Sequence, residues 1–235
     1  MRLFGKTLKF PAAQAEQQPR HVEETRVTVI SDTHLRDEEL RLAEGDLLIH
    51  CGDLLDLDRS EPSDLRKLDR WFGRQPFDMI VCTGGNHDHL LEHARARVPQ
   101  PFRNARYLED EALNYRGLRI YGAPWVPGLP AHAFHEDRPG LANAWARIPA
   151  GIDILVTHTP PHGILDRSSR GMSFGCPDLA RELVRIAPRV HCFGHVHASA
   201  GQARVGKTLF INACSVESKG AGMQRPISFN LPPRS

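Results

Sequence analysis

Five short polar segments of the chain carry side chains that bind metal ions well, and each follows a short apolar run. In chain order the residues are Asp32 and His34 in SDTH, Asp53 in CGD, Asn86, His87 and Asp88 in GGNHD, His158 in THTPP, and His195 and His197 in GHVH. One such segment alone has an ordinary explanation as a turn, a cap or a core histidine. Five successive segments with compatible ligand chemistry indicate one metal site.

The spacing within the segments supports this interpretation. Asp32 and His34, like His195 and His197, stand two residues apart, so in an extended backbone both members of a pair project to the same side. Neighbouring glycines allow sharp turns and a close approach of the backbone. Mixed Asp, His and Asn ligands favour Mn, with Fe, Zn, Co or Ni as alternatives, over Ca or Mg. The cysteines are interpreted as packing residues.

The elements that would position these ligands can be read from the flanking sequence. Short β-rich runs predict buried strands at 26–31, 46–51, 78–83, 152–157 and 189–194, with later strands in ALNY, LRIYGA, KTLFIN and PISFN. Helical spacing predicts helices at 63–75, 89–98, 137–147 and 177–186, with Ser63 as an N-cap and Pro177 as a first helical residue. Polar residues that follow strand ends in an α/β protein converge on one crevice. The expected fold is a layered α/β domain.

Length and composition set the limits of this interpretation. The chain has 235 residues, 40% of them hydrophobic, which suffices for one domain with a large core. We expect residues 1–25 to be an extension and residues 26–235 to form the domain. The net charge of +2 predicts no stable nucleic-acid partner, and no apolar stretch is long enough for a membrane span. Five widely spaced cysteines suggest reduced thiols, which places the protein in the cytoplasm.

The ordered set SDTH, GD, GNHD, THTPP and GHVH resembles the calcineurin-like metallophosphoesterase superfamily from Asp32 to His197. The context THTPPHGILD, followed by VHCFGHVH and FINAC, looks more like its MPPED-type metallophosphodiesterase branch than like the protein phosphatases. The resemblance implies a four-layer α/β/β/α sandwich, in which helices flank two mixed sheets. It also implies two divalent metal ions as cofactors.

The family pattern, carried over position by position, assigns ligands to each of the two ions. It places the first ion on Asp32, His34, Asp53 and His197, and the second on Asp53 as a shared ligand with Asn86, His158 and His195. Two ions about 3.5–4 Å apart bind phosphate oxygens and activate a bridging hydroxide for in-line attack. His87 is left without a metal, so it is the candidate to protonate the leaving oxygen, with Asp88 orienting its ring.

Weaker candidates surround these motifs. Arg167 and Arg170 are expected to clamp a phosphate or ribose, although loop arginines are more often solvated. The loop at 123–140 would form a wall or lid, and its Trp125 and Phe134 could stack on a base or simply pack. His50 and His191 are expected to be core residues.

The resulting hypothesis is a phosphoesterase that prefers phosphodiesters, including cyclic nucleotides, because few Lys or Arg residues surround the motifs. Its expected partner is a small phosphate ester such as a nucleotide. A phosphomonoesterase or a nuclease on the same metals is the alternative enzyme, and a non-catalytic scaffold with this fold is a further alternative. The sequence does not indicate an oligomeric state.

Overall fold

The computed structural model describes residues 24–218 and 222–234. The expected extension at 1–25 therefore lies outside the described residues, apart from Glu24 and Thr25. Thr25 already belongs to the first strand. Within the described residues no helix is both long and apolar enough to cross a membrane.

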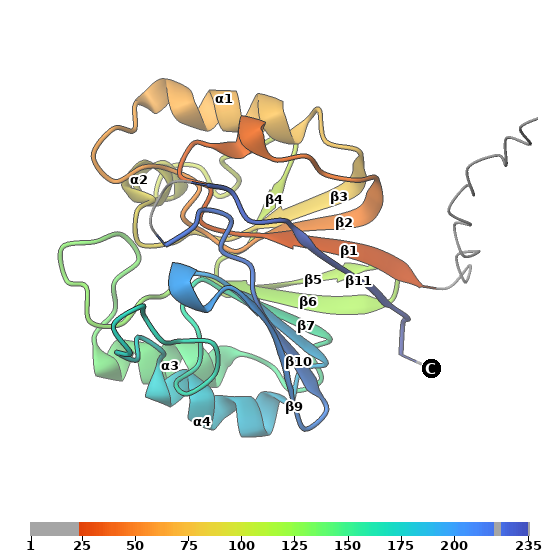
Figure 1. Cartoon of the computed structure of the whole chain (residues 1–235), viewed down its shortest axis with the longest axis vertical. Coiled ribbons are helices and arrows are strands. Elements are labelled where there is room, and N and C mark those ends of the chain that lie inside the picture. The colour runs from red at the N-terminus through yellow and green to blue at the C-terminus, as the bar shows by residue number, and fades with distance from the viewer. Residues whose placement is uncertain (1–23, 219–221, 235) are drawn as a thin grey trace, which may run out of the picture.

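Two mixed sheets stack face to face between two layers of helices, as the sequence resemblance predicted (Figure 1). The first sheet has the order β11-β1-β2-β3-β4, in which only β11 is antiparallel to its neighbour. Its strands are β1 (Thr25–Ile30), β2 (Gly45–His50), β3 (Phe77–Cys82), β4 (Arg106–Tyr107) and β11 (Ile227–Leu231).

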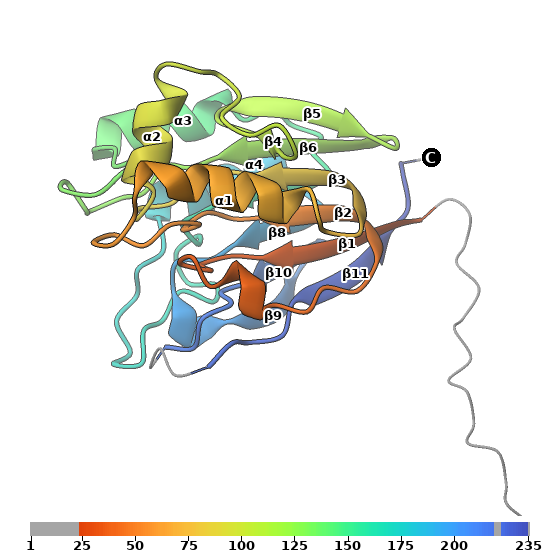
Figure 2. The same cartoon turned by 90° about the horizontal axis from the view of Figure 1, so that it is seen from above.

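The second sheet has the order β5-β6-β7-β8-β10-β9, with four parallel central strands and an antiparallel strand at each edge. Its strands are β5 (Glu111–Tyr115), β6 (Leu118–Ala123), β7 (Ile154–Thr157), β8 (Val190–Phe193), β9 (Gly201–Val205) and β10 (Thr208–Asn212). The strands that precede the five polar segments all run in the parallel direction. Their carboxyl ends therefore meet at one edge of the sandwich (Figure 2).

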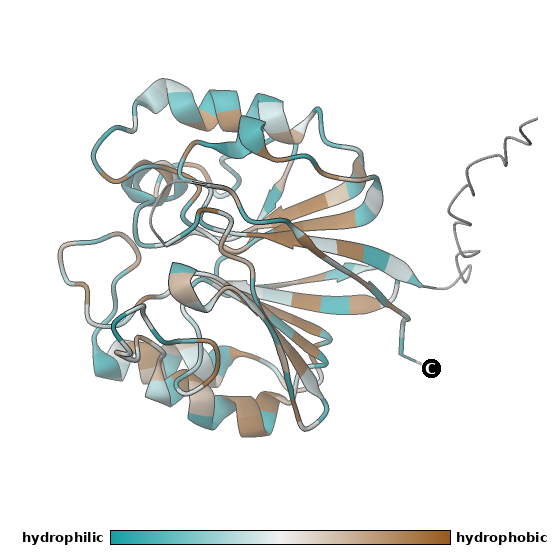
Figure 3. Ribbon diagram, in the orientation of Figure 1, coloured by the Kyte–Doolittle hydropathy of each residue, from teal (hydrophilic) through white to brown (hydrophobic). Residues whose placement is uncertain are grey.

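Helices cover the outer face of each sheet, and a separate apolar layer lies between the sheets (Figure 3). Helices α1 (Pro62–Phe72) and α2 (His89–Arg95) pack on the first sheet, whereas α3 (Arg138–Arg147) and α4 (Pro177–Ile186) pack on the second. Strand β2 illustrates the division. Its Leu47 and Ile49 enter the layer between the sheets, and Leu48 packs beneath α1. A strand buried on both faces has to be apolar at nearly every position, which explains the continuous run DLLIHC.

Local signals placed most elements to within a few residues, but one cap was wrong. Pro177 begins α4 as predicted. Helix α1, in contrast, begins at Pro62, and its N-cap is Glu61 instead of Ser63. The Glu61 amide donates to Asp64 Oδ2 over 2.7 Å, and the Glu61 side chain accepts from the Asp64 amide. This reciprocal pair satisfies two amides that a helix start leaves free, which a cap at Ser63 would not achieve.

The apolar layer between the sheets should carry much of the stability. Leu47 is fully buried there on a strand paired at both edges, so Leu47→Ala should lower the free energy of unfolding by about 2–5 kcal/mol. Val184 on α4 is 86% exposed, and Val184→Ala should change it by at most about 0.5 kcal/mol. Urea titration followed by circular dichroism compares the two variants. A similar, small loss in both would contradict this picture of the core.

Candidate metal centre

The two polar loops that follow β1 and β2 are joined by backbone hydrogen bonds that extend the parallel pairing beyond the strands. The Asp32 amide donates to the Gly52 carbonyl over 2.9 Å, and the His34 amide donates to the Asp53 carbonyl over 3.2 Å. This pairing places Asp32 and Asp53 side by side. Both carboxylates are buried, with 0% and 2% of their surface exposed.

The backbone at these ligands is not extended, so the predicted reason for their convergence was wrong. Asp32, His34, Asp53 and His195 all have positive φ, between 46° and 69°. Non-glycine residues rarely adopt this left-handed region, and each instance costs on the order of 1–2 kcal/mol. The side chains therefore converge through strained turns at the strand ends, and the surrounding hydrogen bonds hold those turns in place.

Two glycines are required because the backbone passes directly against ligand atoms. A Cβ at Gly194 would lie 2.0 Å from Asp32 Oδ2, and one at Gly85 would lie 2.4 Å from Asp53 Oδ1. Neither neighbour can move without displacing a candidate ligand. The close approach that the sequence suggested for these glycines is therefore present at both positions.

Hydrogen bonds to backbone carbonyls orient two histidines toward the carboxylates. His34 Nδ1 donates to the Leu55 carbonyl over 3.1 Å, and His158 Nδ1 donates to the Cys51 carbonyl over 2.9 Å. Because a carbonyl can only accept, the Nδ1 of each ring carries the proton, and Nε2 is the atom that faces the site. Metal-binding histidines in proteins are held by this type of contact.

Asn86 links the remaining histidines to this group. Its Oδ1 lies 2.9 Å from His158 Nε2 and 2.8 Å from His195 Nδ1. On the other side, His197 Nε2 lies 3.1 Å from Asp32 Oδ1 and 3.5 Å from His34 Nε2. The structure thus brings together all seven residues that the family pattern names as ligands.

The buried carboxylates and His158 shift each other's pKa values, and both shifts favour positive charge beside the carboxylates. Burial alone would raise the pKa of Asp53, but His158 beside it holds the pKa well below its usual range. Burial alone would lower the pKa of His158, but Asp53 and Asp32 raise it to about 9. A proton on His158 therefore supplies the charge that a metal cation would supply in its place.

The donor set fits divalent metal ions. Ligand atoms of Asp32, Asp53 and His158 all lie within 4.8 Å of one another, as do those of His34, Asp53 and His87. A third such group joins Asp32, His197 and Cys214, so Asp32 and Asp53 each belong to two of the three groups. Carboxylate, imidazole and amide donors together suit Mn, Fe, Co, Ni or Zn.

His87 lies at the rim of the site, with 30% of its side chain exposed. Its amide donates to Asp53 Oδ1 over 2.8 Å, and its ring lies 4.7 Å from that of His34, centroid to centroid. Its Nε2 is 3.9 Å from Asp53 Oδ2. Burial lowers the pKa of His87, while the nearby Asp53 carboxylate partly opposes that shift. Both a proton-transfer role and a ligand role fit this position.

Asp88 contacts backbone amides from two of the loops. Its Oδ1 accepts from the Leu55 amide and its Oδ2 from the Gly85 amide, each over 2.8 Å. These bonds fasten the loop after β3 to the loop after β2. They give Asp88 a part in positioning Asp53 and Asn86, in contrast to the expected contact with the His87 ring.

Two histidines beneath the site are core residues, as expected. His50 Nε2 lies 3.0 Å from Thr33 Oγ1 in the first sheet, and His191 Nε2 lies 2.9 Å from Thr157 Oγ1 in the second. Burial lowers the pKa of each to about 3. Each neutral ring thus supports a threonine that directly precedes a ligand, His34 or His158.

Cys214 was expected to be a packing residue, but it contacts a candidate ligand. The segment after β10 pairs with the end of β1, where the Ser215 amide donates to the Ser31 carbonyl over 2.8 Å. This contact places the Cys214 thiol 3.2 Å from Asp32 Oδ2, so Cys214 is more than packing. The only sequence signal was a cysteine at a strand end, like the ligands.

His132 is a second neighbour of the site that the sequence did not single out. Its ring centroid is 6.1 Å from that of His87, and its Nδ1 is buried without a hydrogen-bond partner among the described residues. The next amide, of Ala133, donates to the Asn86 carbonyl. The loop at 123–140 is thereby fastened to the metal centre, which accords with its expected role as a wall.

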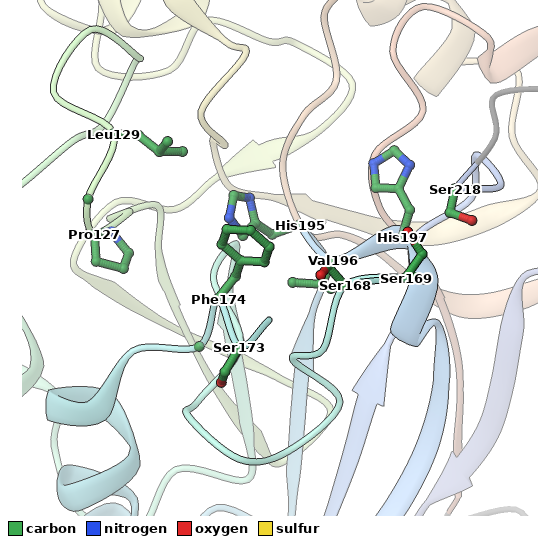
Figure 4. A pocket seen from close by; sticks show the side chains of 13 residues that line it. Pro127, Leu129, Ser168, Ser169, Ser173, Phe174, His195, Val196, His197 and Ser218 are labelled. Carbon is green, nitrogen blue, oxygen red and sulfur yellow. The ribbon is translucent and has the colours of Figure 1, made fainter. Parts of the chain in front are cut away.

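A cavity of about 510 Å³ opens beside His195 and His197 (Figure 4). One wall comes from Pro127 to Leu129 in the 123–140 loop, and the other from the loop at 168–175. Arg167 and Arg170 are exposed and are not among its lining residues. Arg167 turns back onto its own loop, where Nη1 donates to the Gly171 carbonyl over 3.4 Å.

The aromatic residues of the 123–140 loop have packing roles. Phe134 is 2% exposed, and Trp125 Nε1 donates to Asp110 Oδ1 over 2.9 Å. Their rings contact each other edge to face. Of the two roles considered for them, the packing role agrees with these contacts.

Comparison with known proteins agrees with the fold. The profile described as calcineurin-like phosphoesterase matches residues 25–199. Metallophosphoesterase domain-containing protein 1 of Homo sapiens and its counterpart in Mus musculus are each 32% identical over 234 residues, covering 88% of this chain and 71% of the relative. The chain belongs to the calcineurin-like phosphoesterase family, whose members are metal-dependent hydrolases of phosphate esters.

The fold also recurs at low sequence identity. The phosphopantetheinyl hydrolase of Mycobacterium tuberculosis aligns with a TM-score of 0.59 at 14% identity, covering 87% of this chain and 96% of that one. This likeness concerns the architecture of the sandwich alone.

Asp53 and His87 should separate metal binding from catalysis. Asp53→Ala removes a carboxylate that belongs to two of these groups and should lose bound metal together with activity. His87→Ala should retain the metal content of the wild type and lower kcat by about 10²–10⁴-fold, as removal of a general acid does. Elemental analysis of the purified variants gives the metal content. Loss of metal from His87→Ala would instead identify His87 as a ligand.

The Cys214 thiol should help to hold Asp32 in place. Cys214→Ala removes its contact with Asp32 Oδ2 and should weaken Mn binding by about 10–100-fold, whereas Cys214→Ser retains a donor and should lose much less. Cys192→Ala, which removes a buried thiol from the layer between the sheets, serves as the control for general destabilisation. Calorimetric titration with Mn measures the affinities. Equal affinities in Cys214→Ala and Cys192→Ala would show that the thiol only fills space.

Proposed function

We propose that this protein is a binuclear metal-dependent phosphodiesterase that hydrolyses small phosphodiesters, with cyclic nucleotides among the candidate substrates. The proposal rests on the seven converging ligands and on the cavity beside them. In this assignment Asp32, His34, Asp53 and His197 hold one ion, and Asp53, Asn86, His158 and His195 hold the other. Manganese is our first choice of metal.

The protein's own residues would do three things in the reaction. The ions, when bound, would polarise the phosphate and lower the pKa of a water molecule to give the nucleophile. Asp32 and Asp53 would hold the ions, and the hydrogen bonds that keep their turns in place would limit reorganisation of the site. His87 lies at the rim of the site and, in its protonated form, would give a proton to the leaving oxygen. Asp88 would position the loop that carries His87.

The single observation that favours a diester is that none of the described residues lining the cavity is a Lys or an Arg. A phosphomonoester carries nearly two negative charges and gains from cationic contacts around the ions, whereas a diester carries only one. The lining combines Pro127, Leu129 and Phe174 with serines. Such a wall suits an uncharged second substituent on the phosphate. A clamp by Arg167 or Arg170 would require their loop to rearrange.

Other assignments are less well supported. A phosphomonoesterase or a nuclease would use the same ligands, but the cavity is the size of a small-molecule site. A non-catalytic scaffold has no need for all seven ligands. We further propose residues 26–235 as the catalytic domain, with 1–25 as an extension. A cytoplasmic location is suggested by five buried cysteines without disulfides.

The test is a comparison of two aryl esters under one metal and one pH. With Mn added, kcat/KM for bis(4-nitrophenyl) phosphate should exceed that for 4-nitrophenyl phosphate, and both activities should disappear with a chelator and return with Mn, Co or Ni. The comparison then extends to 2′,3′- and 3′,5′-cyclic nucleotides. A clear preference for the monoester would favour the phosphomonoesterase, and turnover in a metal-free preparation would overturn the metal mechanism.

A further inference from the structure

The loop at 166–175 presents an aromatic ring beside the metal centre. Phe174 lines the cavity together with His195 and His197, yet 44% of its surface is exposed (Figure 4). A phenylalanine left half in water forgoes part of the gain of burial, and its exposed ring is available to a ligand in the cavity. It is one of five large hydrophobic residues that are exposed in the described chain, and the only one of them that lines this cavity.

The loop that carries Phe174 is held firmly. The Phe174 amide donates to the Asp166 carbonyl over 2.9 Å, and Arg167 pairs with Ser173 in an antiparallel bridge. Asp166 Oδ2 accepts from the Gly163 amide, the Gly175 amide and the Ser173 hydroxyl. This carboxylate is 2% exposed, so the loop is built around a buried polar centre.

A further contact joins the loop to the segment that carries a metal ligand. Ser199 Oγ donates to the Arg167 carbonyl over 2.7 Å, and Ser199 ends the short helix η2 (His197–Ser199), which begins at His197. The position of the Phe174 loop is therefore fixed relative to the ligands before a substrate binds. A binding surface fixed in this way loses little entropy when a ligand occupies it.

The opposite wall of the cavity completes an apolar cleft. Pro127 and Leu129 come from the loop that Ala133 fastens to Asn86. Figure 4 shows Pro127 and Leu129 on one side of the cavity and Ser168, Ser169 and His197 on the other, with Phe174 between them. An apolar cleft faced by an aromatic ring suits a flat, uncharged group such as an aryl ring or a nucleobase.

His87, the proposed proton donor, lies outside this cleft. His87, our candidate for protonating the leaving oxygen, is not among the residues that line this cavity, whereas His195 and His197 are. The leaving group would thus face His87. The cleft would then receive the substituent that stays on the phosphorus.

We propose that Phe174 determines specificity by packing against the retained substituent of the phosphodiester, and that this cleft selects flat apolar substituents over small ones. This inference rests on the proposed function. Beyond that function, the inference says which part of the substrate is recognised, the retained substituent, and which residue recognises it, Phe174.

Two substrates with the same leaving group and the same charge test the inference. Bis(4-nitrophenyl) phosphate retains an aryl group after cleavage, and methyl 4-nitrophenyl phosphate retains a methyl group. In the wild type with Mn, kcat/KM should favour the aryl substrate. Phe174→Ala should reduce this ratio by about 5–10-fold, in the range of one aromatic contact, and Leu129→Ala should reduce it in the same direction.

Met172→Ala is the matched control, because Met172 lies in the same loop, is 52% exposed and does not line the cavity. It should leave the ratio unchanged. An unchanged ratio in Phe174→Ala, with both substrates still cleaved, would overturn the inference and leave the proposed function intact. If neither substrate is cleaved by the wild type, the proposed function itself fails.

A binding measurement supplies a readout other than turnover. Phenylphosphonate has no ester bond to cleave, so its affinity for the Mn-loaded protein can be measured by calorimetry. Phe174→Ala should weaken phenylphosphonate binding by about 5–10-fold and leave methylphosphonate binding unchanged. Equal effects on the two ligands would show that Phe174 supports the site in general and does not recognise the ring.

Discussion

The site depends on one arrangement, in which two buried carboxylates, Asp32 and Asp53, lie side by side at the ends of adjacent parallel strands. Two such groups repel each other and lose hydration, so they need cations close by. Here His158, whose pKa the two carboxylates raise to about 9, provides positive charge, and divalent ions would provide more. The backbone hydrogen bonds from Asp32 to Gly52 and from His34 to Asp53 keep the two carboxylates from moving apart.

The two sheets meet at this point, and their contacts explain how distant segments form one site. His158 from the second sheet donates to the Cys51 carbonyl of the first, and the segment after β10 pairs with Ser31 after β1. The glycines at 85 and 194 allow these loops to pass within atomic contact of the carboxylates. Strained turns persist because several independent hydrogen bonds hold them, a common arrangement at functional sites.

Around this centre, the candidate metal ligands and the walls of the cavity come from different segments of the chain. The ligands come from the ends of the strands, whereas the cavity walls come from two loops that are each fastened to a ligand segment, one through Ala133 and Asn86 and the other through Ser199. Loops can change in sequence without disturbing the strands beneath them. Phe174, which would select a substrate, therefore lies on a different segment from the residues that would hold the metals, although His195 and His197 line the same cavity.

The sequence by itself placed most strands and helices, because apolar runs repeat along the chain, and its resemblance to a known family supplied the two-sheet class and the seven candidate ligands. It did not determine the left-handed turns at Asp32 and Asp53, since backbone torsions there depend on hydrogen bonds from other loops. Only the tertiary structure showed that Cys214 contacts Asp32 and that Arg167 turns back onto its own loop instead of toward the cavity. Phe174 was not singled out, because exposure beside a cavity is a property of the folded chain, and no local pattern encodes it.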